Sequence, residues 1–314
     1  MSGTYDPSVC KQDDAVLKVY GGVFKDSSRR GALASVNYSG GTSSLHDLLP
    51  DGKTLAYDTA GTELVDVYAV SPFVYGESRA ATEAGRTVYV VDHAQHQIGS
   101  DGKCACGYAP IACVTAGEST DYFDSIQEAV DDAAGKTGST LTLLKDVTLA
   151  EDERVYLESG NFTIDWHGHT VHANTWKDVL TVSKSTSLIL SDTVGGGGIT
   201  NTSQLSGAAV MFNSNPGYTL TITGGIYSPL VQKQGYGTMR ISGGEFQNPQ
   251  DSGKNYALQN DTGNLSDMLA PGYGFFYEDD NSLIRSYSIA NTETNRTVIV
   301  AEHEHSLLDN SYCR

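Results

Sequence analysis

The chain has few charged residues and especially few basic ones, which argues against nucleic acid and anionic membranes as partners. Only 18% of its 314 residues are charged, whereas about 25% is usual for a soluble domain. Its 20 Lys and Arg stand against 38 Asp and Glu, which gives a net charge of −18. Because clustered Lys and Arg are what bind nucleic acid and anionic lipid surfaces, we expect neither as a partner.

Long hydrophobic runs are also missing. No stretch approaches the ~20 apolar residues that span a bilayer, so we expect no membrane insertion. The residues from Met1 to Asp6 have neither the basic nor the apolar segment of a signal peptide. Glycine (34) and tyrosine (18) are abundant instead. This composition favours an extended β architecture outside a cell over a compact helical enzyme of the cytosol.

Cysteine is too scarce and too scattered to form a disulfide framework. An odd number leaves at least one thiol unpaired within the chain, so cysteine alone does not decide the compartment. The five cysteines are Cys10, Cys104, Cys106, Cys113 and Cys313.

A short internal repeat predicts the fold. The segment TLTITGGIY at 219–227 recurs 19 residues later as TMRISGGEF at 238–246. Apolar and polar residues alternate in each copy, as in a half-buried strand, and a Gly-Gly pair then turns the chain. We expect Tyr227 and Phe246, which follow the glycines, to stack inside a solenoid in which each coil packs on its neighbours.

Further short strands are expected upstream, separated by polar turns such as Gly195 to Gly198. A β-sandwich has similar strand spacing and is the competing interpretation, but the fixed 19-residue repeat favours a right-handed parallel β-helix. The expected strands are 140–144, 162–166, 179–182, 187–190 and 208–212.

A short amphipathic helix is predicted just before the first of these strands. Phe123, Ile126, Val130 and Ala133 fall at helical spacing, and Gly135 stands where a helix ends. We expect this helix to cap the open end of the solenoid, which otherwise exposes apolar surface and strand edges.

A second repeat is longer and predicts the domain organisation. The matched segments are 19–24 with 241–246 (offset 222), 45–52 with 265–272 (offset 220) and 86–90 with 296–300 (offset 210). A pair of histidines follows each copy, His93 and His96 and then His303 and His305. The chain is therefore expected to be a fragment of a longer tandem protein. Its predicted parts are the tail of a preceding β-helix repeat (1–30), a small β-rich module (31–92), a His/Cys linker (93–120), the parallel β-helix (121–260) and a truncated second module (261–314).

These segments resemble the right-handed parallel β-helix repeats of large surface proteins of gut Firmicutes. The resemblance is carried by YFDSIQEAV at 122–130, FTIDWHGHTV at 162–171 and the Gly-Gly-x-aromatic turns, together with the Leu-x-Asp-x-Leu and Cys-x-Cys-Gly elements between solenoids. It implies an adhesin-like role, and some surface proteins of this general kind capture host immunoglobulin. Its motifs are structural and imply no chemistry.

An enzyme acting on polysaccharide is the catalytic alternative. A glycosidase needs two carboxylates about 5–10 Å apart, and a lyase needs clustered Asp ligands for Ca²⁺ with a basic residue nearby. Asp165, Asp178, Asp192 and Glu245 follow no recurring face, and Arg240 has no visible acidic partner. We therefore expect no catalytic residues.

Histidine and cysteine form the most specific cluster in the sequence. His93, His96, Cys104 and Cys106 supply four nitrogen and sulfur ligands within 14 residues, the set that tetrahedral Zn²⁺ requires. A metal here would be structural, because all four positions are filled; oxidised or solvated linker residues are the alternative. His167 and His169 alternate along the chain, with His172 three positions on, and could hold a metal, but we expect these histidines to bond turn backbone instead.

The expected function is therefore non-catalytic. We expect a secreted or cell-surface bacterial segment that binds a host ligand, namely a glycoprotein, mucin or immunoglobulin, through residues the sequence does not define. Two alternatives stay open: a polysaccharide lyase or glycoside hydrolase on a β-helix, and a structural spacer. No cofactor other than a structural zinc is expected.

Overall fold

The computed structural model describes residues 4–5, 9–26, 31–93, 96–99, 102–203, 207–250 and 253–303. The chain forms two compact units, 1–109 (unit 1) and 110–314 (unit 2). His305 and Cys313 of the second predicted His/Cys segment lie outside the described residues. Within the described ranges, no helix has both the length and the apolar character needed to cross a bilayer.

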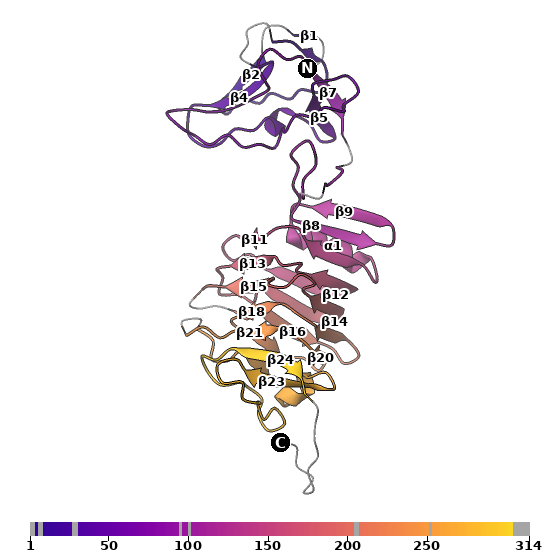
Figure 1. The fold of residues 1–314 in the computed structure, drawn as a ribbon, viewed down its shortest axis with the longest axis vertical. Coiled ribbons are helices and arrows are strands. Elements are labelled where there is room, and N and C mark those ends of the chain that lie inside the picture. The colour runs from indigo at the N-terminus through magenta and orange to yellow at the C-terminus, as the bar shows by residue number, and fades with distance from the viewer. Residues whose placement is uncertain are drawn as a thin grey trace. The chain divides into compact units, whose positions relative to one another are not determined.

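Unit 2 is a parallel β-solenoid, which confirms the predicted all-β solenoid class (Figure 1). Three stacks of parallel strands run along it, and the chain visits them in the same order in each coil. The first stack consists of the start of β12 (Val155–Asp165), the start of β14 (Leu180–Ser191), β16 (Val210–Ser214), β19 (Val231–Lys233) and β22 (Leu258–Asn260). The second consists of β10 (Thr140–Leu143), the ends of β12 and β14, β17 (Thr219–Ile222) and β20 (Thr238–Ile241). The third consists of β11 (Val147–Thr148), β13 (Thr170–Ala173), β15 (Gly198–Asn201), β18 (Ile226–Ser228) and β21 (Glu245–Phe246).

The 19-residue repeat corresponds to one coil of this solenoid. Leu220 pairs with Met239 and Ile222 with Ile241, each 19 positions apart. Other coils are longer, since Ile189 pairs with Thr221, 32 positions on. The repeat was legible only where the turns between strands are shortest, because longer turns vary in length and sequence.

Aromatic residues stack in the solenoid core as predicted from the Gly-Gly turns. The rings of Tyr227 and Phe246 stack with centroids 5.6 Å apart, and both side chains are fully buried. The Trp166 Nε1–H donates to Tyr227 Oη at 3.0 Å, and Tyr227 Oη–H donates to the Gly224 carbonyl at 2.9 Å. One buried hydroxyl thus satisfies polar groups from two other positions of the solenoid.

Replacing Tyr227 with Phe should destabilise unit 2 by about 1–3 kcal/mol, because it leaves a buried indole N–H and a carbonyl without this partner while keeping the ring. Urea unfolding measures the effect, and Tyr236→Phe, at a side chain that is 78% exposed, is the matched control. Equal stability of the two variants would contradict the hydrogen-bonded core.

Both ends of the solenoid are closed by non-parallel elements. Helix α1 (Ile126–Gly135) buries Ile126, Ala129, Val130 and Ala133 in the solenoid core, and the Ser125 hydroxyl accepts the Glu128 N–H at its start. The hairpin of β8 (Ala112–Ala116) and β9 (Ser119–Phe123) pairs antiparallel with β10. At the other end, β24 (Val298–Glu302) lies antiparallel between β21 and β23 (Tyr273–Tyr277). These strands cover the edges that a solenoid otherwise exposes.

The predicted linker 93–120 is divided in the structure. Its first part, through Ala109, belongs to unit 1, whereas β8 and the first two residues of β9, Ser119 and Thr120, belong to the sheet of unit 2. The hairpin was not expected, because the polar residues Ser119 to Asp121 lack the alternation of a half-buried strand.

The described part of unit 1 contains two small sheets. Their elements are β1 (Thr4–Tyr5), β2 (Val9–Gln12), β3 (Val23–Phe24), β4 (Leu33–Asn37), η1 (His46–Leu48), β5 (Lys53–Ala56), β6 (Ser78–Ala81) and β7 (Val88–Asp92). The pairs β1–β3 and β2–β4 are parallel, like coils of the solenoid, and β5 and β7 are antiparallel.

The long repeat has a structural counterpart. Phe24 pairs with Val88 on β7 as Phe246 pairs with Val298 on β24, and Leu55 pairs with Val90 as Phe275 pairs with Val300. The short helix η1 is matched by η2 (Leu265–Met268). The two copies thus share strand pairing at the offsets found in the sequence.

Each copy contains a cation–π contact between an arginine and a tyrosine ring. Arg86 lies 3.6 Å from the ring centroid of Tyr57, and Arg296 lies 3.6 Å from that of Tyr277. The tyrosine hydroxyls accept the N–H of Glu83 at 2.9 Å and of Glu293 at 2.7 Å. No sequence pattern marked this contact, although both arginines lie in the repeated segment Arg-Thr-Val.

Candidate metal centre

The two cysteines of the predicted cluster lie on a tight turn. Gly107 N–H donates to the Cys104 carbonyl, and Cys104 N–H donates to the Tyr108 carbonyl, each at 2.8 Å. Gly107 has φ +91°, and a Cβ there would lie 1.8 Å from Asp66 Oδ1. The positive φ favours glycine at this position, and the two thiols of the turn converge on one site.

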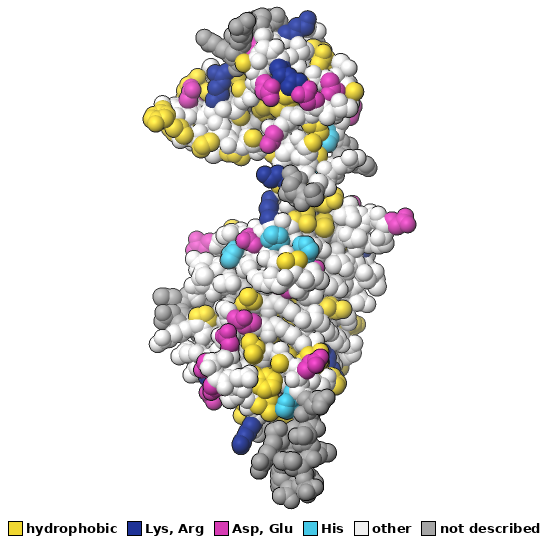
Figure 2. Space-filling model, in the orientation of Figure 1, with side chains coloured by type: hydrophobic (Ala, Val, Ile, Leu, Met, Phe, Trp, Pro, Cys, Tyr) yellow, Lys and Arg dark blue, Asp and Glu magenta, His cyan; other side chains and the backbone are white. Residues whose placement is uncertain are grey.

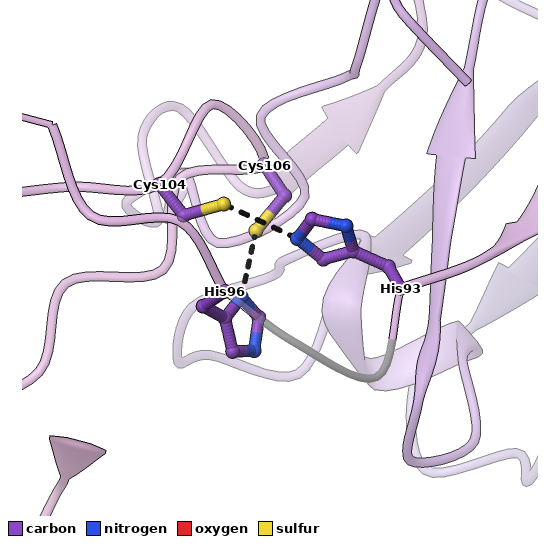
Figure 3. Close-up of side chains that lie close together, drawn as sticks. All are labelled: His93, His96, Cys104 and Cys106. Atoms are coloured by element: carbon purple, nitrogen blue, oxygen red, sulfur yellow. Dashed lines mark hydrogen bonds between the residues drawn. The ribbon is translucent and has the colours of Figure 1, made fainter. Parts of the chain in front are cut away.

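The two histidines approach the thiols from the end of β7 (Figure 3). His93 N–H donates to the Gly52 carbonyl at 2.9 Å, which fixes the point where the chain leaves the strand. His93 Nε2 lies 3.2 Å from Cys104 Sγ, and His96 Nδ1 lies 3.4 Å from Cys106 Sγ. The structure thus brings together all four residues that the sequence singled out.

The ligand atoms have the separation that a metal requires. One nitrogen or sulfur atom from each residue lies within 4.8 Å of all the others. With Zn–S bonds of ~2.3 Å and Zn–N bonds of ~2.0–2.1 Å, a tetrahedral ion places nitrogen and sulfur about 3.6 Å apart. The two short nitrogen–sulfur distances are close to that value.

Burial sets the electrostatics of the cluster. Cys104 and Cys106 are 4% and 0% exposed. Burial raises the pKa of the Cys106 thiol to about 12 and lowers the pKa of His93. A neutral imidazole is the form that binds metal, and a bound cation stabilises the thiolate that burial disfavours.

Aromatic rings pack around the cluster. Tyr108 stacks on His96 with centroids 4.0 Å apart, and Tyr68 meets His96 edge-on at 6.3 Å. Tyr68 also stacks on His46 at 4.2 Å. Tyr108, stacked on His96, supports that ligand, whereas Tyr68 reaches it only edge-on. Nothing in the sequence spacing of these rings marked them beforehand.

Two histidines of the solenoid, His167 and His169, contact side chains of turn residues and not the turn backbone that was expected. His167 Nδ1 lies 3.2 Å from Thr193 Oγ1, and His169 Nδ1 lies 3.4 Å from Asp146 Oδ1. Asp165, once considered for catalysis, accepts from Thr193 and from the His167 N–H. Asp192 bonds the N–H groups of Gly168 and Gly197. These carboxylates stabilise turns.

Comparison with protein-family models, with curated proteins and with solved structures gave no match to this chain.

The second copy of the module offers an internal comparison. His303 N–H donates to the Gly272 carbonyl at 2.8 Å, as His93 N–H does to Gly52. His303 therefore occupies the position of the first ligand in the second module.

Proposed function

We propose that His93, His96, Cys104 and Cys106 hold one structural Zn²⁺. The convergence of four nitrogen and sulfur ligand atoms within 4.8 Å carries this proposal. Four protein ligands complete a tetrahedral shell and leave no position for water or substrate. The ion then ties the segment after β7 to the Cys-x-Cys turn, which stabilises a unit with a small core.

Cobalt substitution tests this proposal. Purified chain treated with Co²⁺ should develop the intense visible absorption of a tetrahedral ion with thiolate ligands, and one equivalent of Zn²⁺ should remove it. Cys106→Ser should weaken or abolish these bands, whereas Cys113→Ser, a thiol on β8 of unit 2, should not. The weak absorption of octahedral cobalt in the unsubstituted chain would contradict the site.

At the level of the whole chain, we propose a non-catalytic segment of a secreted or cell-surface bacterial protein that binds a host glycoprotein, mucin or immunoglobulin. The solenoid supports this by offering an extended surface of stacked coils. Unit 1 supports it with exposed apolar side chains near one another in the chain, Val70, Phe73, Val74 and Tyr75. Figure 2 shows hydrophobic side chains gathered at a projecting end of this unit. Exposed apolar patches of this kind mark contact sites for proteins.

The enzymatic alternative has weaker support. A groove of about 790 Å³ between α1 and β12 is lined by Asp131 and Glu158. Asp131 accepts from Gln127 at 2.9 Å. A hydrogen bond from Lys184 lowers the pKa of Glu158, whereas a general acid needs a raised pKa. All described carboxyl groups with a shifted pKa are shifted downward: Asp58, Glu63, Asp146, Glu158, Asp165 and Asp280.

A pull-down from mucosal secretion tests the binding proposal. The unsubstituted chain should enrich a single host protein, and the variant Phe73→Ser/Tyr75→Ser should lose that enrichment because it removes apolar contact area. The matched control is Trp176→Ser, at an exposed aromatic of unit 2. No enrichment would favour a spacer, and degradation of a polysaccharide by the chain would favour the enzyme.

A further inference from the structure

Unit 1 has a long loop that the second module lacks. Seventeen positions separate Leu64, which bridges to Ala56, from Ala81 at the end of β6. Eight positions separate the equivalent Leu283 and Asn291, which bridge to Phe276 and Gln259. The first copy is thus nine residues longer here. We name residues 66–78 the apolar loop, because it carries Val70, Phe73, Val74 and Tyr75 with their side chains exposed.

The base of the apolar loop is built on the Cys-x-Cys turn. Val67 N–H donates to the Cys106 carbonyl at 2.9 Å, and the Asp66 carboxylate lies against Gly107. Asp66 Oδ1 also accepts the Ala69 N–H at 2.9 Å, which begins the loop. The backbone carbonyl of Cys106, a proposed metal ligand, is therefore hydrogen-bonded directly to the apolar loop.

A second connection runs through aromatic rings. Tyr68 contacts the ring of the ligand His96, the ring of Tyr108 at 5.5 Å and the ring of His46. His46 N–H in turn donates to the Val67 carbonyl at 2.8 Å. A displacement of His96 thus removes a ring that packs on Tyr68, and a displacement of the cysteine turn removes the hydrogen bond to Val67.

Farther out, the apolar loop has few fixed contacts among the described residues. Ser43 and Ser71 exchange two backbone hydrogen bonds at 2.8 and 3.1 Å, and Val74 N–H donates to the Glu77 carbonyl at 2.8 Å. The Tyr75 side chain is fully exposed, and the Tyr75 backbone has a positive φ of +54°. Since the tip buries no apolar side chain, the order of the loop depends on its base.

We propose that metal occupancy at His93, His96, Cys104 and Cys106 fixes the conformation of the apolar loop. This inference rests on the proposed zinc centre. An ion that binds the ordered site and not the relaxed one stabilises the ordered state by its differential affinity.

Hydrogen exchange on the full chain tests the coupling. With Zn²⁺ bound, the amides of Val67, Ala69 and Ser71 should be protected, and removal of the metal by a chelator should accelerate their exchange by at least about tenfold. Peptides from 219–246 in the solenoid should not change. Tyr68→Ala should keep its zinc, measured on the same sample, but should lose most of the chelator-dependent difference. Tyr75→Ala, at the exposed tip, should retain that difference.

The outcomes separate the two proposals. A chain that takes up no zinc overturns the metal centre and the coupling with it. A chain that binds one zinc while residues 66–78 exchange equally with and without it overturns the coupling alone. Loss of zinc in Tyr68→Ala would also contradict the inference, because it would make Tyr68 a part of the site and not the connection to the loop.

Discussion

Replacing Cys106 with Ser is expected to remove the bound zinc and to lower the free energy of unfolding of unit 1 by about 4 kcal/mol or more. Zinc present at about 1,000 times its dissociation constant contributes roughly 4.1 kcal/mol to the folded state. The substitution leaves a hydroxyl that is a poor ligand at a position that is 0% exposed. All four ligands belong to unit 1, so the stability of unit 2 should not change.

Urea unfolding followed by hydrogen exchange resolves the two units in the full chain. Peptides covering β5 and β7 should lose protection at a lower urea concentration in Cys106→Ser, whereas peptides covering β17 to β21 should not. Cys113→Ser is the matched control, since it makes the same change at a half-buried thiol of unit 2. Unchanged unfolding of β5 and β7 in the Cys106 variant would show that the cluster contributes nothing as a metal site.

Gly198→Ala is expected to disrupt the solenoid at the pairing of β15 with β18. A Cβ at Gly198, whose φ is +154°, would lie 1.9 Å from the Ile226 carbonyl oxygen and 2.6 Å from the Ile226 nitrogen. Backbone of the next coil cannot move away without breaking its own pairing. Backbone strain of about 1–2 kcal/mol and overpacking of about 1–3 kcal/mol give an expected loss of about 2–5 kcal/mol.

Gly195→Ala separates the two causes. Gly195 has φ +90°, but a Cβ there meets no atom within 4 Å. The variant Gly195→Ala should therefore lose only the backbone strain of about 1–2 kcal/mol from its free energy of unfolding. Urea unfolding of unit 2 measures both variants, and equal losses would contradict the close approach of neighbouring coils at Gly198.

The solenoid was predictable where its coils are short. The pairing of 219–222 with 238–241 was legible because alternation, the Gly-Gly turn and the aromatic residue recur at one fixed spacing. Elsewhere the prediction divided what the structure joins. The expected strands 179–182 and 187–190 are one strand, β14, since the backbone turns at Lys184 (φ +50°) while pairing with β12 continues on both sides.

The four ligands of the metal centre were predictable from the sequence, but the aromatic residues that surround them were not. Four residues of the right types lie within 14 positions, so their convergence follows from local sequence. The rings of Tyr68 and His46 reach the site from residues 25 or more positions away from His93, and no periodic pattern connects them. The apolar loop was missed for the same reason, because its partner Ser43 lies 28 positions from Ser71.

The metal content of the purified full chain tests the central claim most directly. Native mass spectrometry should find one zinc ion per chain, retained in Cys113→Ser and His303→Ala and lost in Cys106→Ser. His303 is a described residue of the second module and is not one of the four ligands, which is why His303→Ala serves as the control. A chain that carries no zinc after purification with zinc present, or one whose zinc survives Cys106→Ser, would contradict a structural zinc at His93, His96, Cys104 and Cys106.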